Sequence, residues 1–180
     1  MEIYLIRHTT PSLSPGLIYG RFEVPLMDTF PGEFEIIKSQ LPQKFNAVYS
    51  SPSTRCTLLA QRITPDFITD ERLTELDFGD WEGQTWDTVN ETDLQVWMDD
   101  FVNVVVPGGE SMVQMNARIL SFWDELLTSS AQKIAVVTHG GVIRLILAYL
   151  QNVALVNAFE IKVGYGEVVK LSIPTSPDSN

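Results

Sequence analysis

Both histidines of this 180-residue chain follow directly after short apolar runs, and both have neighbours that suit phosphate chemistry. His8 comes immediately after Arg7, and His139 precedes Gly140-Gly141. A neutral imidazole can act as a nucleophile when its unprotonated nitrogen faces an electrophile. Nearby arginines favour the neutral ring and bind phosphate through paired, charge-assisted hydrogen bonds. These residues therefore predict a site for a phosphoryl group.

A second arginine, Arg55, falls in the first turn of a predicted helix. We expect this helix to begin at Ser51-Pro52, with serine as N-cap and proline at the first helical position, and to run to about Ile63. Gly140-Gly141 opens another predicted helix, which continues to Leu150. The free N–H groups at a helix start suit an anion, which strengthens the phosphate prediction.

The elements that must position these residues are short strands alternating with helices. Apolar runs predict buried strands at 2–6, 47–49 and 133–137, and a 3/4 spacing of apolar residues predicts a helix from Met112 to Leu126. This alternation is typical of an α/β domain with a mostly parallel central sheet. Active sites of such sheets lie at the carboxyl ends of the strands, where all the candidate residues could meet. The segments 159–163 and 167–173 are expected to form a closing hairpin.

Composition excludes several classes of protein. With 23 Asp and Glu against 12 Lys and Arg, the net charge of −11 would repel nucleic acid and anionic membranes. One cysteine allows no internal disulfide, and with two histidines it cannot form the usual zinc cages. No run of 18 apolar residues occurs that could span a membrane. We therefore expect a cytoplasmic protein without metal or cofactor.

The charge is concentrated in one segment. From Leu73 to Ala117 ten carboxylates occur without any Lys, Arg or His, whereas the rest of the chain is almost neutral. If this segment lies near the site, it would disfavour substrates that carry several phosphates. The whole chain is interpreted as a single domain over 1–173, with an acidic lid-like insertion at about 76–110 and a disordered tail at 174–180.

The motifs resemble those of the histidine phosphatase superfamily, also called the phosphoglycerate mutase-like fold. The resemblance covers Ile3 to about Leu150, and its fold is a three-layer α/β/α sandwich. Five motifs occur in the family's order, namely Leu5-Ile6-Arg7-His8, Ser50-Ser51-Pro52-Ser53-Thr54-Arg55, 73–83, Pro107-Gly108-Gly109-Glu110-Ser111 and Thr138-His139-Gly140-Gly141.

The resemblance implies a two-step phosphoryl transfer without a cofactor. His8 would attack phosphorus and become a phosphohistidine, while Arg7, Arg55 and His139 would hold the equatorial oxygens. Glu75 would protonate the leaving alkoxide and then take a proton from the hydrolytic water.

Other roles stay open at the level of the sequence. Glu82 is the alternative general acid, and Gly140 is a further candidate for substrate binding. An Arg-His-Thr-x-Pro start followed by Tyr19-Gly20-Arg21 is most similar to the alpha-ribazole phosphatase branch, which removes a 5′-phosphate during cobalamin assembly. By analogy Tyr19, Gly20 and Arg21 would line the substrate pocket.

Alternative functions are a broad small-molecule phosphatase, a phosphoglycerate mutase-like enzyme, and a catalytically silent binding module of the same fold. In each case the expected partner is a small phosphate ester, and the oligomeric state is left open. The spacing of Cys56 and Arg62 matches cysteine-dependent phosphatases, but the residues between them favour a helix that would place the two on different faces.

Overall fold

A single five-stranded sheet runs through the computed structural model, which describes residues 1–174. Its strand order is β3-β2-β4-β1-β5. The strands are β1 (Glu2–Arg7), β2 (Ala47–Ser50), β3 (Ile68–Thr69), β4 (Lys133–Thr138) and β5 (Val168–Ser172). All neighbours are parallel except β1 and β5, which are antiparallel. The predicted α/β class with a mostly parallel sheet is confirmed. The tail predicted at 174–180 lies outside the described residues from position 175 onward.

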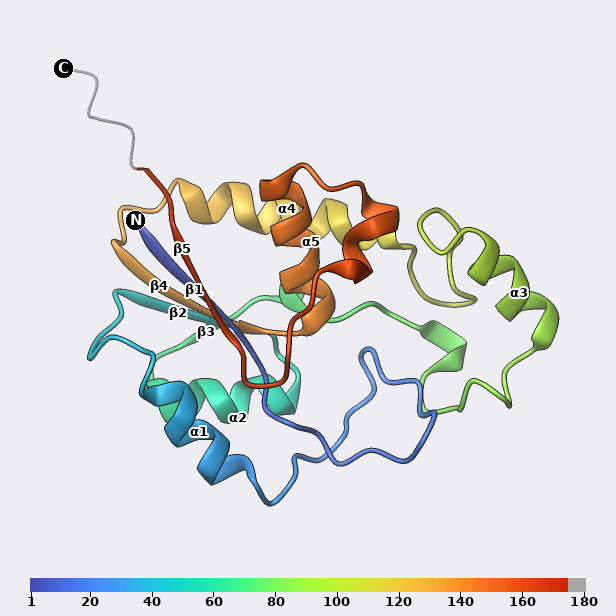
Figure 1. Cartoon of the computed structure of the whole chain (residues 1–180), viewed down its shortest axis with the longest axis horizontal. Helices are drawn as coiled ribbons and strands as arrows, with labels where there is room; N and C mark the ends of the chain where they lie inside the picture. The colour runs from blue at the N-terminus through green and yellow to red at the C-terminus, as the bar shows by residue number, and fades with distance from the viewer. Residues whose placement is uncertain (175–180) are drawn as a thin grey trace.

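Helices cover both faces of this sheet, with α1 and α2 on one side and α4 and α5 on the other (Figure 1). The helices are α1 (Phe30–Lys38), α2 (Thr54–Ile63), α3 (Glu91–Asp99), α4 (Met112–Leu127) and α5 (Gly140–Gln151), with short 3-10 turns at Glu71–Leu73, Gly79–Trp81 and Leu155–Glu160. No helix within residues 1–174 is long and apolar enough to cross a membrane.

The two layers of the core follow from the alternation of side chains along the strands. On β1, Ile3 and Leu5 pack in the cluster beneath α4 and α5, whereas Tyr4 and Ile6 pack in the cluster beneath α1 and α2. Helix α4 buries one face at the 3/4 spacing seen in the sequence, from Met112 to Leu126. Each such large apolar side chain contributes roughly 1.5–3 kcal/mol on burial.

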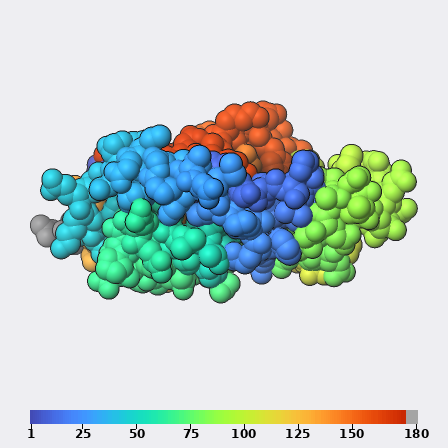
Figure 2. All heavy atoms as spheres, turned by 90° about the horizontal axis from the view of Figure 1, so that it is seen from below, coloured from blue at the N-terminus to red at the C-terminus, as the bar shows by residue number. Residues whose placement is uncertain are grey.

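The acidic segment extends from one end of the molecule, with α3 farthest from the sheet (Figure 1), and Figure 2 shows it projecting at that end. It has a small core of its own, in which Trp81, Val89 and Val106 pack with Ile18. The segment is therefore anchored by apolar contacts to the loop that follows β1. Its action as a lid stays a prediction.

Three local predictions were wrong or incomplete. Helix α2 begins at Thr54 with Ser53 at its N-cap, later than predicted, and Ser51 Oγ lies 2.8 Å from His139 Nε2. The predicted closing hairpin does not form, since residues 155–160 make a 3-10 turn and β5 pairs with β1 instead. Strand β3 was not predicted, because its two residues are too few for a periodic pattern.

Candidate active site

Strand register brings the motif residues to one edge of the sheet. Arg7 at the end of β1 is paired with Thr138 at the end of β4, so His8 and His139 follow at the same level. Ser50 at the end of β2 is paired with the residue before Thr138. The two imidazole rings lie with their centres 5.3 Å apart. The expected meeting of these residues at the carboxyl ends of the strands is thus found in the structure.

His8 is held as a neutral ring with one free nitrogen. It is 2% exposed, and its Nδ1 lies 2.8 Å from the carbonyl oxygen of Thr9, to which Nδ1–H donates. Nε2 has no partner among the described residues and keeps its lone pair. Burial, with Arg55 and Arg7 adding to it, lowers the pKa of His8 to about 3, against the opposing effect of the Thr9 carbonyl.

Arg7 and Arg55 are anchored through their terminal amino groups. Arg7 Nη1 donates to the carbonyl of Val163 at 2.6 Å, while Arg55 donates to the carbonyls of Phe22 and Gly20 at 3.0 and 2.5 Å. The Nε–H groups of both arginines are buried and have no hydrogen-bond partner among the described residues. Buried unpaired donors are rare and costly, so these two are candidate donors to an anion.

His139 is fully buried behind Arg55 rather than beside a free space. Its Nδ1 lies 3.3 Å from Arg55 Nη2, which can only donate, so Nε2 carries the proton and donates to Ser51 Oγ at 2.8 Å. Burial and the nearby Arg55 lower the pKa of His139 well below its ordinary value. In this arrangement His139 contacts Arg55, and its expected contact with the phosphoryl oxygens stays a prediction.

Glu75 lies against the start of α5. Its carboxylate accepts from the backbone N–H of Leu76 at 3.0 Å and from that of Gly141 at 2.9 Å. A Cβ at position 141 would lie 2.1 Å from Glu75 Oε1, and one at Gly140 would lie 3.0 Å from Arg7 Cζ. The Gly140-Gly141 pair therefore provides the room in which an acid and a cation approach the helix.

Glu82, the alternative acid, is committed to the loop that follows β1. It accepts from the backbone N–H groups of Gly20, Arg21 and Phe22, and from that of Phe78. These bonds give Glu82 a structural role, and its part as the alternative general acid stays a prediction.

The side chain of Arg21 is held by two carboxylates, and its part in substrate binding stays a prediction. It forms ion pairs with Asp77 at 3.3 Å and Glu110 at 3.6 Å. Gly20 contributes through its carbonyl to Arg55, and a Cβ there would overlap the backbone of Leu76.

Tyr19 reaches the site together with a tyrosine that sequence reasoning missed. The hydroxyl groups of Tyr19 and Tyr165 lie 2.5 Å apart, and burial raises the pKa of Tyr19 above its ordinary value. The ring of Tyr165 stacks on Arg7, with Cζ 3.8 Å from the ring centre, and lies next to His8. The predicted hairpin places Tyr165 in its turn. The glycines on both sides of Tyr165 are the one feature of the sequence that indicates a loop in close contact with another segment.

A cavity of about 210 Å³ extends from Arg7, Tyr19 and Glu75. Its remaining walls are mostly apolar, with Arg144 as a further charged group. The apolar members are Leu76, Phe78, Met112, Met115, Leu145, Ala158 and Phe159. This space lies next to Glu75.

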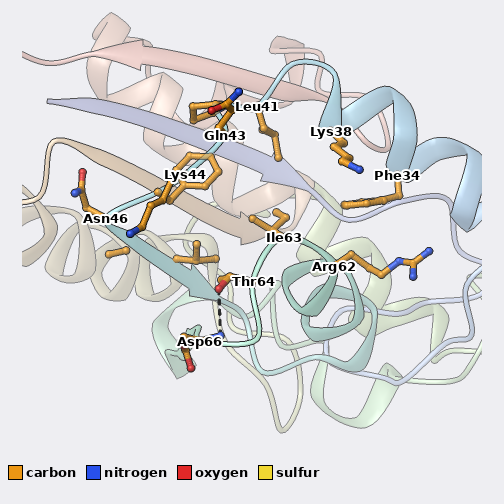
Figure 3. A pocket seen from close by; sticks show the side chains of 14 residues that line it. Phe34, Lys38, Leu41, Gln43, Lys44, Asn46, Arg62, Ile63, Thr64 and Asp66 are labelled. Carbon is orange, nitrogen blue, oxygen red and sulfur yellow. Dashed lines mark hydrogen bonds between the residues drawn. The ribbon is translucent and has the colours of Figure 1, made fainter.

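A larger hollow of about 600 Å³ lies at the opposite end of β2, between α1 and α2. Of its three cations, Lys38 and Arg62 lie toward one end of it and Lys44 toward the other (Figure 3). Arg62 lies 5.4 Å from the ring centre of Phe34. The hollow contains none of the candidate catalytic residues.

Cys56 has no part in nucleophilic chemistry here. It is fully buried in α2, and burial raises the pKa of its thiol to about 12. Within the part of the chain that the structure describes, no group of three His, Cys, Asp or Glu side chains could hold a metal ion.

Comparison with known proteins agrees with this geometry. The family model of the histidine phosphatase superfamily (branch 1) matches residues 3–176. A Hydrogenobacter thermophilus protein named "Putative phosphoserine phosphatase 2" is 28% identical over 179 residues, covering 94% of this chain and 88% of its own. The adenosylcobalamin/alpha-ribazole phosphatase of Salmonella typhimurium is 28% identical over 177 residues, covering 92% of this chain and 87% of its own.

Among solved structures, the alpha-ribazole phosphatase of Shigella flexneri has the same fold, with a TM-score of 0.88 at 24% identity, over 97% of this chain and 91% of that one. The five-stranded sheet with helices on both faces is thus the phosphoglycerate mutase-like arrangement predicted from the motifs. On the family match over almost its whole length, this chain belongs to the histidine phosphatase superfamily, branch 1.

Proposed function

We propose that the protein is a phosphomonoesterase that works through a phosphohistidine on His8. The observation that carries this proposal is the pair of unpartnered, buried Nε–H donors of Arg7 and Arg55 beside a neutral imidazole with a free Nε2. A phosphoryl group satisfies both donors and presents its phosphorus to that nitrogen.

In the first step the Nε2 lone pair of His8 forms a bond to phosphorus while the bond to the ester oxygen breaks. Arg7 and Arg55 stabilise the charge on the phosphoryl oxygens, and His139 keeps Arg55 in place. Glu75 gives its proton to the leaving alkoxide. In the second step water attacks phosphorus, Glu75 takes the proton of that water, and the P–N bond breaks to restore the lone pair of His8.

The substrate that we propose first is alpha-ribazole 5′-phosphate, which would place the enzyme in cobalamin assembly in the cytoplasm. The resemblance of the Tyr19-Gly20-Arg21 region supports it, as do relatives named for that activity. The apolar and aromatic walls of the cavity also suit the flat base of that nucleotide. Other relatives are named for phosphoserine, so a broader phosphatase is the second candidate.

The test is hydrolysis of an aryl phosphate without added metal, in wild type and His8→Ala. We expect turnover that a chelator does not affect and loss of turnover in the variant. We also expect a phosphorylated Nε2 of His8 in protein quenched with an alkaline denaturant, because the P–N bond of phosphohistidine hydrolyses in acid. Full activity of His8→Ala, or dependence on Mg²⁺, would falsify the mechanism. A panel with alpha-ribazole 5′-phosphate, phosphoserine and 3-phosphoglycerate then identifies the substrate, and isomerisation of 3-phosphoglycerate would indicate a mutase.

A further inference from the structure

The cavity beyond Glu75 holds a guanidinium that the proposed reaction does not use. Arg144 lies on α5 three residues after Gly141, so the two residues are on the same face of the helix. The backbone N–H of Gly141 holds the carboxylate of Glu75. Its side chain lines the same cavity as Arg7 and Glu75. An alcohol bound next to Glu75 would therefore meet Arg144.

Two contacts hold the Arg144 side chain in this direction. Its Nε donates to the carbonyl of Ile161 at 3.0 Å, and its Cζ lies 5.8 Å from the ring centre of Phe159. Its terminal amino groups have no hydrogen bond within residues 1–174, and no carboxylate there forms an ion pair with it. The guanidinium is thus held in place with most of its donors unused.

Within residues 1–174, three of the four other arginines outside the phosphate site differ in this respect, and the fourth, Arg62, forms no ion pair either. Arg21, Arg72 and Arg118 each form an ion pair with at least one carboxylate. Arg144 is partly buried, and this burial, with a smaller effect of Arg7, lowers its pKa below the ordinary value. A desolvated cation without a counterion gains from a hydrogen-bond acceptor, most of all from an anionic one.

The walls around Arg144 define the rest of the ligand. Leu76, Met112 and Leu145 present apolar surface, and Phe78 and Phe159 present aromatic rings. Phe159 is 45% exposed, so this end of the cavity opens to solvent and a polar group there need not be fully dehydrated. The space fits an apolar body with one acceptor at its outer end.

We infer that Arg144 is a specificity-determining residue, which binds a hydrogen-bond acceptor at the far end of an apolar leaving group and binds a carboxylate most strongly. The inference rests on the proposed phosphatase activity. It concerns the alcohol part of the substrate and not the phosphoryl group. It adds to the substrate choice above a requirement that the alcohol carry an acceptor within reach of Arg144.

The test uses three matched esters, which are 4-carboxyphenyl, 4-carbamoylphenyl and 4-methylphenyl phosphate. Binding to His8→Ala is measured by calorimetry, because that variant cannot form the phosphohistidine and Kd is independent of how easily each phenol leaves. We expect 4-carboxyphenyl phosphate to bind about tenfold more tightly than 4-methylphenyl phosphate, with 4-carbamoylphenyl phosphate between them. The difference is limited to about tenfold because water partly screens an accessible charged hydrogen bond.

The matched variant is Arg144→Met in the same background, which keeps an unbranched apolar side chain without donors. We expect 4-carboxyphenyl phosphate to lose its tenfold higher affinity, and 4-methylphenyl phosphate to keep its Kd within about twofold. Arg144→Lys should retain part of the preference, and it serves as the test if the methionine variant does not fold.

Two results would overturn the inference: equal binding of all three esters to His8→Ala, or an equal loss of affinity for all three in Arg144→Met, which would indicate a structural role at Ile161. The proposed function fails separately, when wild-type enzyme hydrolyses none of the three esters although they bind. The binding preference is measured in either case.

Discussion

Replacing Gly141 by alanine tests whether Glu75 is the general acid. The added Cβ would lie 2.1 Å from Glu75 Oε1, whereas ordinary contact begins at 3.4 Å, so the carboxylate must retreat by more than about 1 Å. A displacement of this size can cost about 100-fold in rate. The hydrogen bond from Gly141 N–H to Glu75 Oε2 would be lost in the same movement.

The expected result depends on the leaving group. For an alkyl phosphate, whose alkoxide must be protonated, we expect kcat/KM to fall about 100-fold in Gly141→Ala. For 4-nitrophenyl phosphate, whose phenolate leaves without a proton, the fall should be less than about fivefold. Steady-state kinetics on both esters, with wild type alongside, measures the difference.

Gly32→Ala is the matched control. Gly32 lies in α1, and a Cβ there meets nothing within 4 Å. Alanine should raise the free energy of unfolding by roughly 0.5–1 kcal/mol and leave both rates unchanged. If Gly141→Ala lowers the two rates equally, or lowers neither, Glu75 is not the proton donor. Urea unfolding of both variants separates this outcome from a loss of fold.

Three further predictions concern charge and capping. Glu82→Gln should lower the free energy of unfolding by about 2 kcal/mol, because four backbone N–H groups lose a charged acceptor. The dependence of kcat/KM on the leaving group should stay as in wild type. A loss of kcat/KM confined to alkyl phosphates would indicate that Glu82 is the acid. Ser111→Ala removes the N-cap of α4 and should cost about 1 kcal/mol in urea unfolding without an effect on kcat. His8 and His139 are neutral in the folded protein, whereas the unfolded chain protonates them below about pH 6.5, so stability should fall from pH 6.5 toward pH 5. A flat profile of urea midpoints over that interval would contradict these burial effects.

The sequence was sufficient for the residues that belong to regular elements. His8 and His139 each follow an apolar run, and the parallel register that brings them together is a general property of such sheets. Prediction failed at 159–167, where no periodicity exists. Tyr165 contacts the site from a loop, and Arg144 lies one turn of helix away from Gly141. The sequence has no pattern that indicates either position.

The backbone contacts of Glu82 could not be predicted for a related reason. A glutamate that holds backbone N–H groups and a glutamate that faces a substrate pocket look the same in the sequence. Only the fold shows which N–H groups the carboxylate contacts. Its four backbone partners come from two segments that are about 60 residues apart. Such an assignment requires the tertiary structure.

The acidic segment follows from the same chemistry. Asp77 accepts from the N–H of Gly79, Glu110 accepts from the N–H of Asp77 and pairs with Arg118, and Glu82 collects four further N–H groups. A loop-rich stretch without a sheet must satisfy its main-chain donors by other means, and carboxylates are strong acceptors for them. At least these three charges therefore hold the wall of the cavity in shape. An effect of the segment on substrates with several phosphates would then have to come from carboxylates without such partners. Neutralising Asp80 should change the ratio of bisphosphate to monophosphate turnover while leaving the fold intact. An unchanged ratio would leave the segment with a structural role alone.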